Sequence, residues 1–170
     1  MAAQPPRLSK EQLDAWRAFL RAHSTMLRRI ARDLEEAELP PLTWYDVLAA
    51  LRDSPDGKPL KQVELAERVL LSNSGLSRLV DRIEAKGLVE RVRCPGDRRS
   101  LNIQLTDAGR EMLEQMWPVY ARGIAEDFLP ALGSNAYEMG QRLEQIGREC
   151  QAPPSSASAR SAASAACAAW

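Results

Sequence analysis

Apolar residues recur in alternating steps of three and four along the first part of the chain, the spacing of one face of an α-helix. The pattern predicts a helix over residues 9–38, opened by a capping box between Ser9 and Gln12. At about 1.5 Å per residue this helix is roughly 45 Å long. Because a small domain does not need such a length, we expect the apolar face to pack against a second subunit. That face comprises Leu13, Trp16, Leu20, His23, Leu27, Ile30 and Leu34, with His23 as its polar member.

Three shorter helices are expected after Pro40-Pro41. The first begins at Thr43, which resembles the start of a second capping box with Asp46. The second covers about residues 61–69. The third covers about residues 73–86, with Ser72 as its N-cap and Gly87 where a C-terminal cap favours positive φ. The apolar positions of this third helix, expected to be buried, are Leu76, Leu79, Val80 and Ile83.

The period then changes from helical to alternating. Residues 88–94 and 100–105 are expected to form two strands. Pro95 and Gly96 occupy the central positions of a type II turn between them, so the segment is expected to be a β-hairpin. Two further helices are predicted, one over residues 107–129, capped by Thr106 and bent at Pro118, and one over 134–150.

The fold class predicted from these elements is mostly α with a small β-hairpin wing. A winged helix-turn-helix lobe is expected over residues 43–105, and long dimerisation helices over 9–38 and 107–150. Together they form a single domain over residues 9–150 of the 170 in the chain. The remaining residues, 151–170, form a Ser/Ala-rich tail with eight Ala and five Ser among positions 155–169, which we expect to be disordered.

Composition excludes several classes of protein. The 45% apolar and 27% charged residues are typical of a globular chain, with neither a membrane-spanning run nor a secretory signal expected. Cys94, Cys150 and Cys167 are widely spaced and form no CxxC pair, which favours a reducing cytoplasm over a disulfide framework or a zinc site. His23 is the single histidine, and no glycine-rich nucleotide motif occurs. We therefore expect no enzyme activity, cofactor or metal.

The helix, tight link, helix and hairpin are arranged as in a winged helix-turn-helix. The exposed face of helix 73–86 carries Asn, Ser and Arg, which bind base edges and phosphates in a major groove. Arg98 and Arg99 at the hairpin are expected to reach a minor groove, with Asp97 orienting one guanidinium group. The predicted DNA-binding residues are Ser72, Asn73, Ser74, Ser77, Arg78, Arg82, Arg98 and Arg99. The alternative is a protein-interaction or architectural winged-helix module without operator specificity, whose helix face is merely solvated.

The net charge of the whole chain is zero, but the net charges of its segments are not. The 23 basic and 23 acidic residues sum to zero, which by itself argues against a nucleic-acid binder. Residues 78–106 nevertheless carry seven basic against four acidic side chains, and residues 107–149 carry four against eight. The basic excess therefore lies on the segment predicted to bind DNA.

Residues 65–113 (LAERVLLSNSGLSRLVDRIEAKGLVERVRCPGDRRSLNIQLTDAGREML), with Asp97-Arg98-Arg99 at the hairpin, resemble the DNA-binding core of MarR-type transcriptional regulators. The resemblance implies an obligate homodimer built from the first and the last two helices. It further implies binding of double-stranded DNA at a pseudo-palindromic operator. A small effector would release such a repressor from the operator by shifting the population of its conformations.

Four positions, Trp16, Asp46, Arg78 and Arg91, are similar to the urate-responsive subgroup of that family. The similarity implies a small aromatic or anionic effector, of which a purine such as urate is one example. Trp16 would offer a stacking face, Arg91 would meet the anion, and Asp46 would pair with an arginine. The candidate effector-binding residues are Trp16, His23, Trp44, Asp46 and Arg91. For Trp16 and His23 a packing role in the apolar face is the alternative, and for Cys94 the alternatives are oxidant sensing and a plain strand position.

Overall fold

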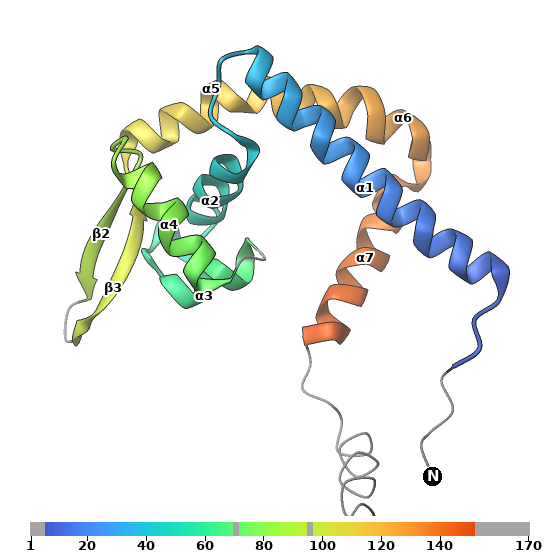
Figure 1. Ribbon diagram of the computed structural model, residues 1–170, viewed down its shortest axis with the longest axis horizontal. Coiled ribbons are helices and arrows are strands. Elements are labelled where there is room, and N and C mark those ends of the chain that lie inside the picture. Colours follow the sequence, from blue (N-terminus) through green and yellow to red (C-terminus); the bar gives the residue numbers. More distant parts are fainter. Residues whose placement is uncertain (1–5, 70–71, 95–96, 152–170) are drawn as a thin grey trace, which may run out of the picture. The chain divides into compact units, whose positions relative to one another are not determined.

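The computed structural model describes residues 6–69, 72–94 and 97–151 (Figure 1). The chain divides into two compact units. One unit is formed by residues 22–127, and the other by residues 1–21 together with 128–170. The first helix, α1 (Lys10–Glu36), contributes to both. That the two units act together as one domain over residues 9–150 stays a prediction.

The start of α1 follows the predicted capping box. Ser9 N donates to Gln12 Oε1 at 2.8 Å, and Gln12 N donates to Ser9 Oγ at 3.3 Å. These two bonds satisfy main-chain groups that have no partner inside the first turn. The observed bounds, Lys10–Glu36, confirm the helix predicted over residues 9–38.

The apolar face of α1 changes character along its length. Ile30 and Leu34 are buried in the core of residues 22–127. In the single chain the earlier members stay accessible, with Trp16 58%, Leu20 44% and Leu27 39% exposed. Only the last turns of the predicted apolar face are therefore covered within one chain.

The remaining helices of the unit formed by residues 22–127 confirm most of the predicted pattern. They are α2 (Leu42–Arg52), α3 (Gln62–Arg68), α4 (Asn73–Glu84) and α5 (Asp107–Gly123), with a 3-10 turn at Pro55–Gly57. The predicted cap of α5 is present, because Gly109 N donates to Thr106 Oγ1 at 3.0 Å. Pro118 lies inside α5, and the bend expected there stays a prediction.

The predicted start of α2 is wrong. No side chain caps the helix, and its first residue is Leu42 rather than a residue after Thr43. Pro41 precedes the helix with φ −56° and ψ 149°, and its carbonyl accepts from Trp44 N at 2.8 Å. Leu42 is buried, so the core draws the helix start toward the prolines and leaves Thr43 exposed inside the first turn.

The hairpin belongs to a three-stranded antiparallel sheet of order β1-β3-β2. Strands β2 (Val89–Cys94) and β3 (Asp97–Leu105) confirm the predicted hairpin, although β3 begins three residues earlier than expected. Strand β1 (Leu60–Lys61) was not predicted, because two residues are too short to show an alternating pattern. Leu60 pairs with Ile103, so β1 lies at the base of the hairpin (Figure 1). The predicted type II turn at Pro95-Gly96 lies outside the described residues.

One apolar core joins all the elements of residues 22–127. Its fully buried side chains come from α1, α2, α3, α4, both hairpin strands and α5, and each contributes about 1.5–3 kcal/mol by leaving water. The largest are Leu34, Leu48, Leu65, Leu76, Ile83, Ile103 and Met116. Close packing requires glycine where α5 meets α1, because a Cβ on Gly123 would lie 2.7 Å from Ile30 Cγ1.

The helix predicted over residues 107–129 is interrupted. After α5 comes a π-helical turn, Ile124–Phe128, and then a short helix, α6 (Leu129–Leu132). Gly133 follows with φ 54°, a conformation that favours glycine. A 3-10 turn at Gly133–Asn135 leads into α7 (Ala136–Gln151), which begins two residues later than the helix predicted over 134–150.

No helix among the described residues combines the length and the apolar character needed to cross a bilayer. The tail expected to be disordered covers residues 151–170; Gln151 ends α7, and residues 152–170 lie outside the described part of the chain.

Candidate nucleic-acid interface

Helix α4 presents one polar face and one buried face, as the sequence predicts. Its four apolar positions, residues 76, 79, 80 and 83, are all buried in the core. Ser72 caps the helix, since Gly75 N donates to Ser72 Oγ at 3.2 Å. A Cβ at Gly75 would lie 3.1 Å from the same Oγ, so the first turn favours a residue without a side chain. The cap and the core together fix which face of α4 points outward.

The outward face holds most of the predicted DNA-binding side chains. Ser72, Ser74, Arg78 and Arg82 are exposed, and Ser77 is half-buried. Asn73 begins the helix, but its side chain lies outside the description. Within the described residues neither Arg78 nor Arg82 forms an ion pair. Exposed guanidinium groups of this kind are able to bind phosphate.

Helix α3 packs against the buried face of α4. Lys61 N donates to Glu64 Oε2 at 3.1 Å, which anchors the start of α3 directly after β1. Leu65 and Ala66 on α3 are buried in the same core as Leu76 and Leu79 on α4. In Figure 1 the two short helices lie beside each other, to one side of the hairpin. This arrangement is that of a helix-turn-helix with a wing.

The predicted wing residues lie at the start of β3. Asp97, Arg98 and Arg99 are the first three residues of this strand, and Asp97 pairs with Cys94 of β2. Nothing is described of the side chains of residues 94 and 97–101. The minor-groove role of Arg98 and Arg99, the orienting role of Asp97 and the alternatives for Cys94 stay predictions.

Arg91 on β2 faces two carboxylates of α4. Its main-chain N–H donates to Glu84 Oε1 at 3.1 Å, and its guanidinium donates both to Glu84 Oε2 and, at 2.5 Å, to Asp81 Oδ1. We call these three residues the Arg91 bridge. The sequence indicated Arg91 as the contact for an effector anion, whereas the structure shows its guanidinium already held by two acidic side chains.

The other predicted effector residues do not form one described cluster. Trp16 belongs to the unit with residues 1–21, where its ring lies 5.8 Å from that of Phe19. Trp44 is half-buried against the core of the other unit, and His23 is exposed there. Asp46 makes no ion pair among the described residues, so the expected arginine partner is not found there. An effector role for these residues stays a prediction.

An aromatic cluster that the sequence analysis did not predict lies near Asp46. Tyr45 and Tyr120 are stacked with ring centroids 4.2 Å apart, and Trp117 lies 6.2 Å from Tyr120. Loss of solvent raises the pKa of the Asp46 carboxyl, although part of the residue remains accessible. Burial, and then the negative charge of Asp46, raise the pKa of the Tyr120 hydroxyl. Trp117 and Tyr120 are three residues apart and so lie on one face of α5, and this spacing is the sequence feature from which the cluster could have been predicted.

A surface cavity of about 540 Å³ lies next to this aromatic cluster, between the end of α2 and the first half of α5. None of the five effector residues predicted from sequence lines it. Arg52 pairs with Asp53 at 2.8 Å, while Arg110 has only a 3.7 Å contact with Asp107. The cavity is lined by Arg52, Arg110, Leu113, Glu114 and Trp117.

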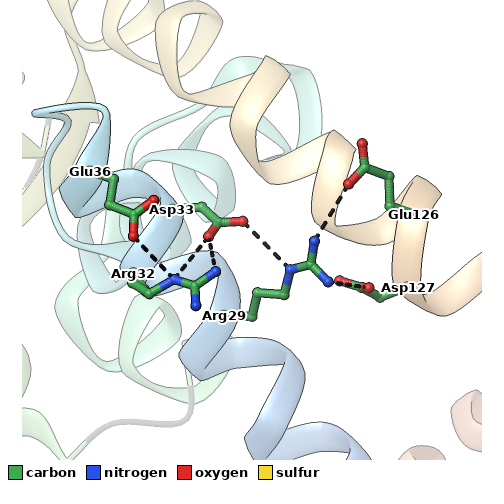
Figure 2. Close-up of polar contacts among 6 residues, drawn as sticks. All are labelled: Arg29, Arg32, Asp33, Glu36, Glu126 and Asp127. Atoms are coloured by element: carbon green, nitrogen blue, oxygen red, sulfur yellow. Dashed lines mark hydrogen bonds and ion pairs between the residues drawn. The ribbon is translucent and has the colours of Figure 1, made fainter.

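A second ionic cluster ties α1 to the π-helical turn (Figure 2). Arg29 contacts Asp127 at 2.5 Å, Glu126 at 3.5 Å and Asp33 at 3.8 Å. Arg32 contacts Asp33 at 2.9 Å. Hydrogen bonds from Arg32, and then the charges of the surrounding arginines, hold the pKa of the Asp33 carboxyl below its usual value. This cluster fixes the end of α5 against α1 beside the close contact of Gly123.

Comparisons with known proteins agree with this geometry. The fold is that of a winged helix-turn-helix, and residues 37–100 match the model of the MarR family. YkoM, an HTH-type transcriptional regulator of Bacillus subtilis, is 31% identical over 116 residues, which is 68% of this chain and 73% of that protein. HosA, a transcriptional regulator of Escherichia coli O111:H-, is 32% identical over 108 residues, 62% of this chain and 77% of its own.

Two solved structures from Streptomyces coelicolor are also similar. The MarR family regulator Sco3205, in complex with DNA, superimposes with a TM-score of 0.77 at 28% identity, covering 89% of this chain and 94% of its own. The MarR family regulator AbsC gives a TM-score of 0.75 at 26% identity, covering 86% and 99%. The chain belongs to the MarR family of transcriptional regulators.

Proposed function

We propose that this chain is a sequence-specific DNA-binding transcriptional regulator that acts as a homodimer on a pseudo-palindromic operator. Helix α4 enters the major groove and the wing reaches the adjacent minor groove. The observation that carries the proposal is the outward face of α4, where Arg78 and Arg82 lie without an acidic partner among the described residues. The DNA complex of Sco3205, a protein with the same fold, supports this docking.

The accessible half of the α1 face supports the homodimer. Trp16, Leu20 and Leu27 lie at helical spacing and are more than one third exposed in the single chain. Contiguous apolar surface of this kind is characteristic of a protein-protein contact. A second copy of α1 supplies a surface of the same chemistry, as a two-fold interface requires.

The DNA-binding proposal is tested on a duplex selected by the purified full chain from a random library. The wild-type protein should protect a two-fold symmetric footprint. Arg78→Ala should weaken binding about tenfold and relax base preference, while Arg98→Ala and Arg99→Ala should weaken it and reduce its salt dependence. Arg7→Ala, which removes one exposed charge ahead of α1 and outside the predicted lobe and dimerisation helices, should have no effect. Absence of any footprint would favour the protein-interaction module instead.

We further propose that a small aromatic or anionic effector releases the operator and so relieves repression. The cavity beside Trp117 supports this, because it combines an indole face with the weakly held Arg110. Urate and substituted benzoates are suitable probes. They should raise the melting temperature of the wild-type protein and weaken its operator binding, with Trp117→Ala retaining operator binding but losing both responses. Loss of the responses in Trp16→Ala alone would place the effector on α1.

A further inference from the structure

The Arg91 bridge joins the two elements that are proposed to touch DNA. Arg91 lies on β2, seven residues after Glu84 in the last turn of α4. Glu84 accepts from both the main chain and the side chain of Arg91, and Asp81 accepts from the other guanidinium nitrogen. The planar guanidinium group donates in two fixed directions, so this contact constrains orientation as well as distance.

The bridge is partly shielded from water at Arg91 and Glu84, whereas the Asp81 side chain is 60% exposed. Arg91 pairs across the sheet with Ile103, which is buried, and its own side chain is only 21% exposed. Glu84 directly follows Ile83, which has no accessible surface. Charge-assisted hydrogen bonds that are partly shielded from water are stronger than those of exposed pairs. The bridge therefore holds α4 and the wing strand in one relative orientation.

The bridge also keeps the acidic Asp81 of α4 from pairing with the basic Arg78 of the same helix. Asp81 follows Arg78 by three residues, a spacing at which an acid and a base on a helix form a pair. In the structure Asp81 is instead held by Arg91, and Arg78 has no ionic partner among the described residues. Without Arg91, Asp81 would compete for Arg78 and would repel the phosphates of a bound duplex.

We propose that Arg91 is a positioning residue for DNA recognition, which acts on the operator through α4 without contacting the duplex. It sets the angle between the recognition helix and the wing, and it keeps Asp81 away from Arg78. The inference rests on the proposed DNA-binding function. It assigns Arg91 a different role from that of an effector ligand.

The test measures binding of the selected duplex by the full-length chain over a series of salt concentrations. Arg91→Ala should weaken binding by about tenfold or more, because two charge-assisted contacts are lost. The slope of log Kd against log salt should stay at the wild-type value, since no phosphate contact is removed. Arg7→Ala, at an exposed position ahead of α1, controls for the loss of one positive charge elsewhere and should change neither quantity. Arg91→Lys should recover only part of the affinity, because an ammonium group cannot hold both carboxylates in one plane.

A charge swap separates positioning from direct contact. Arg91→Glu should bind more weakly than Arg91→Ala, and adding Glu84→Arg to it should restore most of the lost affinity. If Arg91→Ala does not fold, Asp81→Asn combined with Glu84→Gln removes the two carboxylates that hold Arg91. This variant tests the angle of α4 alone, because no Asp81 charge remains to compete for Arg78, and it should still weaken binding.

The proposal is overturned if Arg91→Ala lowers the salt slope by about 0.9 per subunit, the value expected for a lost phosphate contact. It is equally overturned if the swapped pair binds as poorly as Arg91→Glu alone. Failure of the wild-type protein to select any duplex would instead contradict the proposed function, so the two failures are distinguishable.

Discussion

Gly109, in the first turn of α5, lies against Leu88 and the last residue of β3, and its replacement by alanine should strongly destabilise the protein. A Cβ at this position would lie 2.1 Å from the Leu88 carbonyl oxygen and 2.6 Å from Leu105 Cδ1. An ordinary contact needs more than 1 Å of additional separation from that oxygen. The first turn of α5 would have to move away from β2 and β3.

The size of the destabilisation can be estimated from the contacts and hydrogen bonds that such a movement would strain. Thr106 N donates to Leu88 O at 3.2 Å, and Thr106 Oγ1 donates to Gly87 O at 2.7 Å. Overpacking costs about 1–3 kcal/mol, each weakened hydrogen bond costs about 0.5–1.5 kcal/mol, and alanine returns about 1 kcal/mol of helix propensity. We expect Gly109→Ala to lower the free energy of unfolding by about 1–5 kcal/mol.

Urea denaturation followed by circular dichroism measures this change. The protein concentration must be equal for all variants, because the stability of a dimer depends on it. Gly140→Ala is the matched control, since no neighbouring heavy atom lies within 4 Å of its added Cβ. It should leave the protein unchanged or up to about 1 kcal/mol more stable. If Gly109→Ala were no less stable than Gly140→Ala, the close approach of α5 to Leu88 would be refuted.

Three further predictions follow from α1 and α2. Leu34→Ala, at a fully buried position, should lower the free energy of unfolding measured in urea by about 2–5 kcal/mol. Leu20→Ala, at an accessible position, should instead alter the dependence of Tm on protein concentration. If that dependence did not change, α1 would not be the dimer contact. Because the pKa of Asp33 is lowered in the folded state, its contribution to stability is present above the ordinary aspartate range and is lost as the pH falls through the folded pKa. Asp33→Asn should therefore show a shallower acid denaturation curve, and an unchanged curve would contradict this. The pKa of the Asp46 carboxyl is raised in the folded state, so stability is lost as the pH rises through that pKa. Asp46→Asn should therefore be more stable than the wild type at pH 7. The difference between the two proteins should vanish in acid, where the Asp46 carboxyl is protonated.

The features that could be read from the sequence are those set by local spacing. The buried positions of α4, from Leu76 to Ile83, follow directly from helical periodicity, and the caps at Ser72 and Thr106 follow from the chemistry of a helix start. Thr43 carried the same capping signal and was misleading, because the burial of Leu42 fixed the helix start instead. Local signals therefore predict an element well except where the core competes for its first residue.

The features that could not be read depend on contacts between distant segments. Nothing local to Leu60 shows that it pairs with Ile103, and nothing in the spacing of Arg91 and Glu84 shows that a strand and a helix bring them together. The π-helical turn at Ile124–Phe128 likewise coincides with ionic contacts to Arg29, almost one hundred residues earlier. The sequence therefore indicated Arg91 as an effector contact, but it did not show the two carboxylates that hold its guanidinium group.

Because the strand order is β1-β3-β2, the third strand of the sheet supports the wing at its base only. Strand β3 has neighbours on both sides only at its base, where Leu60 and Lys61 pair with Ile103 and Asn102. The residues from Asp97 to Leu101 extend past this support by roughly 17 Å at about 3.4 Å per residue. A tilt of about 5° at the base would displace the tip by roughly 1.5 Å over such an overhang, half the length of a hydrogen bond. If the proposed function holds, a change that loosens the pairing of β1 with β3 should therefore displace Arg98 and Arg99, which lie beyond the paired residues, and shorten the residence time of the duplex.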